Sequence, residues 1–352
     1  MSKSYYSLGL MSGTSMDGVD ASIIQSDGKS KYKAILDKYF EYPKDIFKDL
    51  TTLRDKIKSS KDLKRFEKQT KSIEKEITLF HAKAASKIIK KSKLNVDFIG
   101  FHGQTIFHNA EEQISRQIGD GKLLSKLTKK KVVYNFRQND LKNGGQGAPL
   151  TPIFHSILVK QKKIPLPVVI LNIGGITNYT FIDEKGVSSG LDLGPGNCLI
   201  DQWVRLNSKK KYDENGRIAK SGKIKKIILN KALKNFKKKK LIKSSFDVKD
   251  FDISFVRGLS LEDGAATLTE YTSEILYEYL IDPEGEIWES AIITGGGRKN
   301  KFLIKSIEDK IKSLGTLNSP LKLIDDYGVD GDFIESQAFA YLAIRSYLNL
   351  PI

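Results

Sequence analysis

A polar, glycine-bearing stretch close to the start of the chain holds the first side chains able to do chemistry: LGLMSGTSMDGVD, Leu8–Asp20. Gly13 allows backbone N–H groups to approach a ligand closely, because it has no side chain. The carboxylates of Asp17 and Asp20 are hard oxygen ligands of the kind that divalent cations prefer. The stretch therefore predicts a site for a nucleotide phosphate and its magnesium ion. Three hydroxyls add hydrogen-bond donors there: Ser12, Thr14 and Ser15.

The same stretch has the pattern of a β-hairpin. The apolar run Tyr5–Met11 leads into it, Asp17-Gly18 is a turn dipeptide, and Val19–Gln25 alternates as a second strand. An ordinary hairpin with a polar tip is the alternative to a phosphate site. The number of glycine and hydroxyl residues exceeds what a turn needs, and this favours phosphate binding.

A second strand–turn–strand unit follows much later in the chain. The apolar run Val168–Asn172 is typical of a strand in a covered sheet, and it is followed by Gly174-Gly175 and then Thr177. A third glycine cluster, Gly295–Gly297, follows the apolar strand Ala291–Thr294. Each of these, taken alone, is also typical of a plain turn or loop. Together with the first hairpin they predict a duplicated α/β architecture of two lobes, with the nucleotide in the cleft between them.

Helix and strand signals alternate along the rest of the chain. An apolar stripe at near-helical spacing predicts a long helix from a cap at Ser60 to about Lys93. Asp332 and Glu335 have the spacing of a capping box for a final helix over about 333–347. Further strands are expected at Val96–Phe101 (ending in His102–Thr105), Val132–Phe136, Leu191–Leu193 and Leu321–Ile324, and further helices at Pro152–Val159, from about Cys198, at Leu261–Leu280 with Ser260 as cap, and at Asn300–Ser313.

Composition narrows the class of protein. The 352 residues suffice for two domains, and they include a single cysteine, Cys198, and no apolar run of about 18 residues. A disulfide framework and a membrane span are therefore not expected, and the cytoplasm is the default location. The net charge of +17 comes from lysines without interleaved aromatic residues, so nucleic acid is not an expected partner. The most basic segment, Lys209–Lys249, is expected to form exposed helices or a mobile insert.

Several motifs, in a fixed order, give the chain a resemblance to a known family. They are GLMSGTSMDGVD (Gly9–Asp20), FHGQT (Phe101–Thr105), NGGQGAPLTP (Asn143–Pro152), NIGGITN (Asn172–Asn178), LDLGPGN (Leu191–Asn197), ITGGGRKN (Ile293–Asn300) and GDFIESQAFAYLA (Gly331–Ala343). Any one is weak, but together they span nearly the whole length. The chain resembles the anhydro-N-acetylmuramic acid kinases of the sugar-kinase/Hsp70/actin superfamily. This resemblance implies a two-lobed, actin-like ATPase fold, a duplicated ribonuclease H-like α/β architecture.

The resemblance also implies an ATP-dependent reaction. Water opens the 1,6-anhydro bridge of 1,6-anhydro-N-acetylmuramic acid, and O6 receives the γ-phosphoryl group. The product is N-acetylmuramic acid 6-phosphate, in the recycling of peptidoglycan. Such a reaction needs a carboxylate that activates water at the anomeric carbon. It also needs magnesium and backbone N–H groups that stabilise the phosphoryl charge, so ATP and Mg²⁺ are the expected cofactors.

On this resemblance Asp192 is the expected catalytic base. It lies on a short strand just before the rigid turn Gly194–Gly196, and a turn-initiating aspartate is the alternative. Asp17 and Asp20 are the expected magnesium ligands. The residues expected to hold the nucleotide are Gly13, Thr14, Ser15, Met16, Asp17, Gly18, Val19 and Asp20 of the first hairpin, Gly174, Gly175 and Thr177 of the second, and Gly295, Gly296 and Gly297 beside the adenosine.

On the sugar side the resemblance points to Thr105, Arg137 and Glu335. The Arg137 guanidinium could pair bidentately with the lactyl carboxylate, whereas a capping box explains Glu335 equally well. His102 either orients its loop or is a packed histidine at a strand end. One departure concerns Asn135, which stands where the family commonly has an acidic residue, and it predicts an altered affinity for the sugar.

Two other classes of function stay open. One is another small-molecule kinase of the same superfamily, in which Asp192 deprotonates a hydroxyl rather than water. The other is a non-catalytic, ATP-gated binding protein of the Hsp70/actin kind. Incorporation of water oxygen at the anomeric carbon would distinguish the anhydro-sugar kinase from the other small-molecule kinase. Turnover that depends on sugar would exclude the non-catalytic binding protein.

The expected division of the chain follows the motifs. The first lobe is predicted at Met1–Lys131 with residues 325–352, and the second at Val132–Ile324. The resemblance implies a homodimer, while no residue pattern by itself indicates one.

Overall fold

The computed structural model describes residues 3–240, 245–280, 289–314 and 321–352. The chain divides into two compact units, Met1–Lys163 with Asp332–Ile352, and Ile164–Gly331. The first unit thus extends beyond the predicted boundary at Lys131. It does so because the strand that starts there, β6 (Lys131–Tyr134), pairs in parallel with β4 of the same unit.

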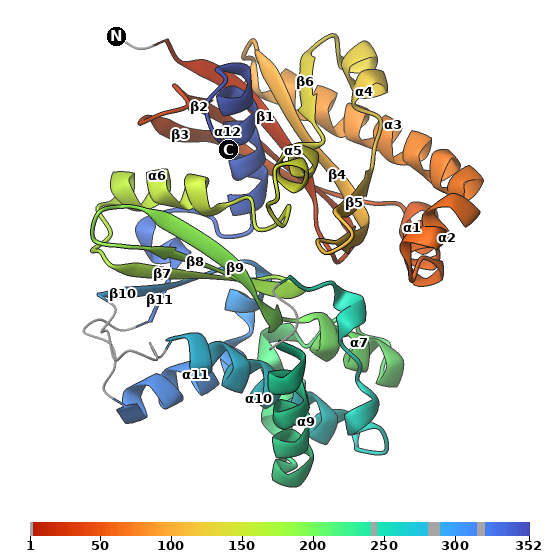
Figure 1. Cartoon of the computed structure of the whole chain (residues 1–352), viewed down its shortest axis with the longest axis vertical. Helices are drawn as coiled ribbons and strands as arrows, with labels where there is room; N and C mark the ends of the chain where they lie inside the picture. The colour runs from red at the N-terminus through yellow and green to blue at the C-terminus, as the bar shows by residue number, and fades with distance from the viewer. Residues whose placement is uncertain (1–2, 241–244, 281–288, 315–320) are drawn as a thin grey trace. The chain divides into compact units, whose positions relative to one another are not determined.

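The first unit is built on a mixed sheet with the strand order β3-β2-β1-β4-β5, in which β6 also pairs with β4 (Figure 1). β1 to β3 form an antiparallel meander, and β4 runs parallel to β1. The predicted first hairpin is therefore confirmed as β1 and β2. The strands are β1 (Tyr5–Ser12), β2 (Gly18–Ser26), β3 (Tyr32–Glu41), β4 (Phe98–Asn109), β5 (Ile114–Ile118) and β6.

Helices pack on both faces of this sheet, because side chains of β1 alternate between them. Leu8 and Leu10 share a core with the apolar stripe of α3 on one face. On the other face α12 lies so close that a Cβ at Gly9 would be 1.8 Å from the Ser336 carbonyl oxygen. The helices of this unit are α1 (Lys44–Lys56), α2 (Ser60–Arg65), α3 (Glu67–Ser92), α4 (Gly121–Thr128), α5 (Phe136–Lys142), α6 (Pro152–Lys162) and α12 (Ile334–Tyr347).

Two predicted helix starts are wrong. The long helix has Ser59, not Ser60, at its N-cap, and it is broken into α2 and α3 at Phe66, whose φ of −104° and ψ of 20° are not helical. The final helix has Phe333 at its N-cap, without a side-chain hydrogen bond, so Asp332 is not the capping residue. The expected start of α6 at Pro152 is confirmed.

Two predicted strand ends are also wrong. β4 does not end at His102 but continues through Thr105 to Asn109, because it gains an antiparallel partner, β5, that was not predicted. The strand expected at Val132–Phe136 ends at Tyr134. Asn135, with a φ of 59°, leaves the extended conformation, and α5 begins at Phe136.

The second unit repeats the arrangement of the first. Its sheet has the order β9-β8-β7-β10-β11, with an antiparallel meander of β7 to β9 and parallel pairs of β10 with β7 and with β11. This repetition confirms the duplicated α/β architecture. The strands are β7 (Val168–Ile173), β8 (Ile176–Ile182), β9 (Ser188–Pro195), β10 (Ser290–Thr294) and β11 (Lys322–Leu323).

The helices of the second unit cover a core that includes Val169, Leu171 and Ile173 of β7. The α-helices are α7 (Cys198–Asn207), α8 (Arg217–Ser221), α9 (Lys226–Lys240), α10 (Leu261–Leu280) and α11 (Lys301–Leu314), and the short 3₁₀ turns are η1 (Glu214–Gly216), η2 (Val248–Asp250), η3 (Ser254–Val256), η4 (Gly296–Lys299) and η5 (Ile324–Tyr327). No helix among the described residues is long and apolar enough to cross a membrane.

The described part of the basic segment Lys209–Lys249 contributes to a second hydrophobic core of this unit and is not an exposed insert. Leu229, Ala232 and Phe236 of α9 are buried at helical spacing in a cluster with α7 and α10. The many neighbouring lysines made this apolar stripe difficult to recognise in the sequence. Part of the segment, residues 241–244, lies outside the described residues.

Candidate active site

The base of the first hairpin is braced by buried polar side chains. Ser12 Oγ lies 2.6 Å from Gln104 Oε1 and accepts a hydrogen bond from the Tyr42 hydroxyl at 3.1 Å. Gln104 Nε2 in turn donates to the Gly13 carbonyl at 3.0 Å. Because Ser12 and Gln104 are buried, these bonds tie the hairpin tip to β4. Ser12 is thus a brace, whereas the sequence suggested a donor to the ligand.

The residues of the tip differ in what they expose. The side chains of Thr14 and Ser15 are exposed, and Ser15 Oγ donates to Asp17 Oδ1 at 2.6 Å. Met16 and Val19 are buried in the core of the unit. Of the predicted nucleotide residues, these two therefore offer their backbone and not their side chains.

The two glycines of the hairpin have different reasons to be glycine. A Cβ on Gly18 would lie 2.5 Å from the Phe40 carbonyl oxygen, so close packing against β3 requires a glycine there. A Cβ on Gly13 would approach no described atom closer than Ser15 Oγ, at 3.9 Å. Packing within the unit does not explain Gly13, and its backbone is open to close approach.

Carboxylates gather beside this hairpin. Asp20 pairs with Tyr39 across β2 and β3. Burial raises the pKa of the Tyr39 hydroxyl, and the negative charges of Asp17, Asp20 and Glu41 raise it further. Among the described residues, no three His, Cys, Asp or Glu side chains are arranged as a complete metal site. Magnesium commonly takes one or two carboxylates and completes its shell with water and phosphate oxygens, so Asp17 and Asp20 fit a partial ligand set.

The tip of the second hairpin is fixed by its backbone. The Gly174 and Gly175 carbonyls accept hydrogen bonds from the N–H groups of Asn197 and Gly196, both at 2.9 Å. The Thr177 hydroxyl is buried and has no hydrogen-bond partner within the described part of the chain. An unsatisfied buried hydroxyl costs about 1–3 kcal/mol, and a phosphate oxygen that accepts from it would remove this cost.

Asp192 lies on a strand as predicted, and only 6% of it is exposed. The turn expected from Gly194 is wrong, because β9 continues through Gly194 and Pro195, which pair with Thr177 and Ile176 of β8. Its Oδ2 accepts two hydrogen bonds at 3.1 Å, from Ser245 Oγ and from the backbone N–H of Phe246. Donors to a carboxylate oxygen stabilise the ionised form, which is the form that a general base requires. Sequence reasoning missed Ser245 and Phe246, because no local pattern links them to Asp192.

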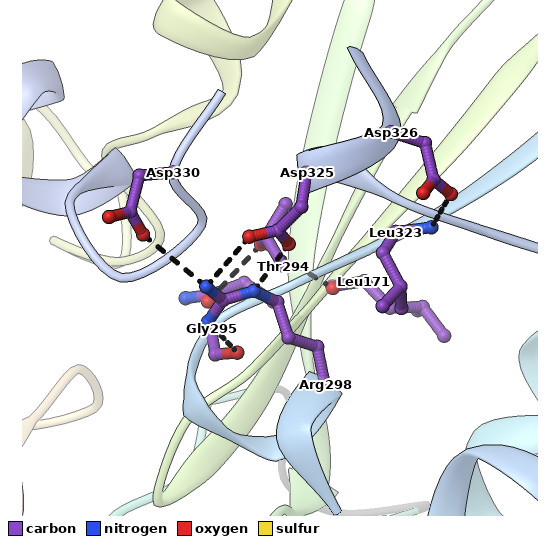
Figure 2. Close-up of polar contacts among 9 residues, drawn as sticks. Leu171, Thr294, Gly295, Arg298, Leu323, Asp325, Asp326 and Asp330 are labelled. Carbon is purple, nitrogen blue, oxygen red and sulfur yellow. Dashed lines mark hydrogen bonds and ion pairs between the residues drawn. The ribbon is translucent and has the colours of Figure 1, made fainter. Parts of the chain in front are cut away.

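The third glycine cluster is held by Arg298, as Figure 2 shows. The buried guanidinium donates from Nε to Asp325 Oδ2 at 2.6 Å and from Nη2 to Asp325 Oδ1 at 3.0 Å, with Asp330 Oδ1 3.4 Å away. Nη1 donates to the Gly295 carbonyl at 3.1 Å. The hydrogen bonds from Arg298 lower the pKa of Asp325. Arg298 belongs to the motif ITGGGRKN, yet its role as an anchor of the loop was not predicted.

The three glycines of this loop also differ. Gly295 has a φ of 77°, and its Cβ would lie 2.4 Å from Asn172 Oδ1, while a Cβ at Gly297 would lie 2.2 Å from Ile173 Cγ2. At Gly296 no described atom lies within 4 Å of the Cβ position. Packing therefore explains the outer two glycines and leaves space beside Gly296.

The predicted sugar residues all belong to the first unit. Arg137 donates from Nε to His102 Nε2 at 3.1 Å and from Nη1 to the Gly147 carbonyl at 2.7 Å. His102 donates from Nδ1 to the Gly103 carbonyl at 2.9 Å, and burial together with the Arg137 charge keeps its pKa well below the ordinary value. His102 therefore stays neutral and accepts a hydrogen bond from Arg137, a contact that was not predicted.

A cavity of about 460 Å³ lies beside β5 and α5. Thr105 borders this region, since its hydroxyl accepts from Gln117 Nε2 at 3.1 Å. Arg137 and Glu335 are not among the described residues that line the cavity, and Glu335 lies in the first turn of α12. Asn135, the departure from the family pattern, is one of the lining residues. All of these residues are polar: Ser115, Arg116, Gln117, Asn135, Gln138 and Lys142.

Comparison with known proteins identifies the family. The family model described as anhydro-N-acetylmuramic acid kinase matches residues 5–352. Among solved structures, an activator of 2-hydroxyisocaproyl-CoA dehydratase from Clostridium difficile with bound ADPNP is 11% identical at a TM-score of 0.48, over 99% of this chain and 98% of that one.

Two curated relatives are much closer in sequence. The anhydro-N-acetylmuramic acid kinase of Pelagibacter ubique is 57% identical over 100% of this chain and 94% of the relative. That of Zymomonas mobilis is 38% identical over 98% of this chain and 94% of the relative. By the family match and these relatives, the chain belongs to the anhydro-N-acetylmuramic acid kinase family.

Proposed function

We propose that this protein is an ATP-dependent kinase that opens the 1,6-anhydro ring of 1,6-anhydro-N-acetylmuramic acid and phosphorylates O6. The product is N-acetylmuramic acid 6-phosphate, which enters peptidoglycan recycling. The observation that carries the proposal is membership of the kinase family over residues 5–352, with a 57% identical relative over the full length. The buried, hydrogen-bonded carboxylate of Asp192 supports it from the structure.

Asp192 is the proposed base of the reaction. It accepts a proton from a water molecule as the water oxygen bonds to the anomeric carbon. The bond between that carbon and O6 breaks, and its electron pair stays on O6. O6 then bonds to the γ-phosphorus, while the oxygen that bridged the β- and γ-phosphates leaves with ADP.

The residues proposed to hold ATP are the glycine loops singled out in the sequence. The open backbone at Gly13, the tip glycines of the second hairpin and the Thr177 hydroxyl bind phosphate oxygens, and the space at Gly296 admits adenosine. Asp17 and Asp20 would hold Mg²⁺. When bound, this ion supplies positive charge that stabilises the phosphate oxygens during transfer.

On the sugar side, we assign the lactyl carboxylate to Arg137, which neutral His102 holds in place. Thr105 and Glu335 are the other proposed contacts of the sugar. Arg137→Ala should raise the KM for the sugar at least about tenfold, because a charge-assisted hydrogen bond is worth about 1.5–3 kcal/mol. The KM for ATP should change little. Equal effects on both KM values would contradict the assignment.

Labelled water tests the ring-opening reaction against an ordinary kinase. Turnover in H₂¹⁸O should place one ¹⁸O atom at the anomeric carbon of the product and none in the phosphate, as read by mass spectrometry of the product and of its dephosphorylated sugar. Product without label at the anomeric carbon would show that Asp192 activates a hydroxyl and not water. The control is product incubated in H₂¹⁸O without enzyme, which measures spontaneous exchange.

We further propose that the enzyme acts in the cytoplasm on this small-molecule sugar, as a homodimer, without nucleic acid or membrane as a partner. Light scattering coupled to size-exclusion chromatography tests the dimer. A monomeric mass at micromolar concentration would contradict it.

A further inference from the structure

The basic helix α9 ends beside the proposed base, although 48 residues separate Lys240 from Asp192 in the sequence. Lys240 Nζ donates to the carbonyl oxygens of Asp192 and Leu193, both at 3.3 Å. The same ammonium lies over the Tyr279 ring, 3.9 Å from its centre. Lys240 thus joins the end of α9 to the backbone of β9 at the reacting residue.

Two further donors lie on the carboxylate of Asp192 itself. Ser245 Oγ and the Phe246 N–H both lie 3.1 Å from Oδ2, and Ser245 is 5% exposed. The Phe246 ring packs 6.0 Å from the Phe236 ring of α9, so the segment that carries both donors rests on the same helix as Lys240.

Among the described residues, two carboxylates act on the Lys240 ammonium. Burial lowers its pKa to about 8, while the carboxylates of Asp192 and Glu278 act in the opposite direction. Glu278 is already paired with Lys237 at 2.6 Å. Lys237 has 61% of its side chain exposed, so the ammonium of Lys240 differs from its neighbour in turning away from water.

We propose that Lys240, Ser245 and the backbone N–H of Phe246 form a clamp around Asp192: the two donors on Oδ2 hold the carboxylate ionised and in one orientation, and Lys240 fixes the backbone that carries it and places a positive charge nearby. The three are positioning residues for the ring-opening step. This inference rests on the proposed role of Asp192 as the base. Hydrogen bonds to the carboxylate and a nearby positive charge both stabilise the charged form, and a base that is fixed in one orientation needs less reorganisation in the transition state.

The pH dependence of kcat/KM tests the clamp. Its acidic limb reports protonation of the base, so Ser245→Ala and Lys240→Met should each move that limb upward by about one pH unit. Lys240→Arg and Ser245→Thr, which keep the charge or the hydroxyl, should stay close to the wild type. Lys234→Met removes an exposed lysine of the same helix and is the matched control. An unmoved limb with a uniform loss of rate would show that these residues act only in packing.

A second measurement does not depend on turnover. With ¹³Cε-labelled lysine, NMR should show the Lys240 ammonium titrating near pH 8 in the wild type and at lower pH in Asp192→Asn, because the attraction of the carboxylate is lost. The Lys240→Arg spectrum assigns the signal. Identical titration in both proteins would overturn the clamp. If the anhydro sugar gives no turnover while the titration shifts, the clamp stands and the proposed reaction fails.

Discussion

The two units of the molecule share one strand order but fix their hairpin tips by different means. In the first unit, side chains do so: Ser12 and Gln104 join β1 to β4 and hold the Gly13 carbonyl. In the second, the backbone does so, since the Gly174 and Gly175 carbonyls bind N–H groups that follow β9. The comparison teaches that the duplicated sheet provides the position of each hairpin tip, while each tip has its own support.

The glycines sharpen this comparison. Each unit offers a pair of loop glycines of which packing requires one and leaves the other open: Gly18 and Gly13 in the first, and Gly297 and Gly296 in the second. A methyl group added at the first kind should affect stability, and at the second kind nucleotide binding. The units thus contain their own matched controls.

The two units are expected to differ most in their stability at acidic pH. All four histidines of the chain lie in the first unit, and burial lowers the pKa of His81 and of His155 to about 4 and that of His102 well below its ordinary value. Below about pH 6.5 the unfolded chain binds protons that the folded unit does not, so the free energy of unfolding falls by about 1.4 kcal/mol per pH unit for each of these three buried histidines.

Urea unfolding followed by hydrogen exchange at pH 7 and pH 5 measures this loss. We expect amides of the first unit to exchange faster at pH 5, after correction for intrinsic rates, and those of the second unit to change less. His155→Gln should flatten the pH dependence. Equal unfolding free energies at the two pH values would contradict the buried neutral histidines.

The next largest effects are expected from substitutions at Gly18 and Gly13 of the first hairpin. Gly18→Ala should lower the free energy of unfolding by about 2–3 kcal/mol, because its Cβ meets the Phe40 carbonyl. Gly13→Ala should leave stability within about 0.5 kcal/mol and raise the KM for ATP at least about tenfold, a loss of about 1.4 kcal/mol of binding. Thermal melts and ATP kinetics of both variants measure these two effects. Loss of stability in Gly13→Ala without an effect on ATP would reverse the interpretation.

The pair in the second unit repeats the test on the adenosine side. Gly297→Ala should destabilise by about 2 kcal/mol, because its Cβ meets Ile173. Gly296→Ala should fold normally and weaken ATP binding by about tenfold, as a calorimetric titration with ATP would show. Unchanged ATP affinity in Gly296→Ala would place the adenosine elsewhere.

The smallest effect concerns the anchor of that loop. Asp325→Asn removes the charge that Arg298 binds in a bidentate pair, at a carboxylate that is 42% exposed. The loss should be about 1–1.5 kcal/mol, since partial exposure screens the pair. The lowered pKa of Asp325 means that its contribution is complete above the unfolded pKa near 4 and is lost as pH falls below it. The free energy of unfolding of both proteins, measured at pH 7 and pH 3, gives the cost of the substitution and its pH dependence. Between the two pH values, Asp325→Asn should lose less stability than the wild type.

Local patterns in the sequence predicted much of the fold. The first hairpin and the helix Leu261–Leu280, where Ser260 Oγ accepts from the Asp263 N–H at 3.1 Å, depend on neighbours in sequence. The turn of that hairpin was nevertheless misplaced: it lies at Thr14-Ser15, where the Met16 N–H donates to the Gly13 carbonyl at 3.1 Å, and not at Asp17-Gly18, because Gly18 already belongs to β2. The duplicated order follows from two such hairpins, each followed by a parallel strand. These features could be predicted because their causes lie within a few residues.

The supports of the candidate site could not be predicted in the same way. Ser12 hydrogen-bonds Gln104, which is 92 positions away in the sequence, and Ser245 hydrogen-bonds Asp192, which is 53 positions away. No spacing rule encodes such pairs, which arise from tertiary packing. The break at Phe66 and the strand β5 were missed for a related reason, because the interactions of one whole unit overrode a local periodicity.

Release of ADP tests the central claim most directly. Wild type and Asp192→Asn are compared in a coupled assay with ATP, magnesium and 1,6-anhydro-N-acetylmuramic acid. The account predicts ADP release that depends on the sugar and falls by about 10²- to 10⁴-fold in the variant, which still binds ATP. Turnover on an ordinary hexose but none on the anhydro sugar, or equal rates for the two proteins, would contradict it.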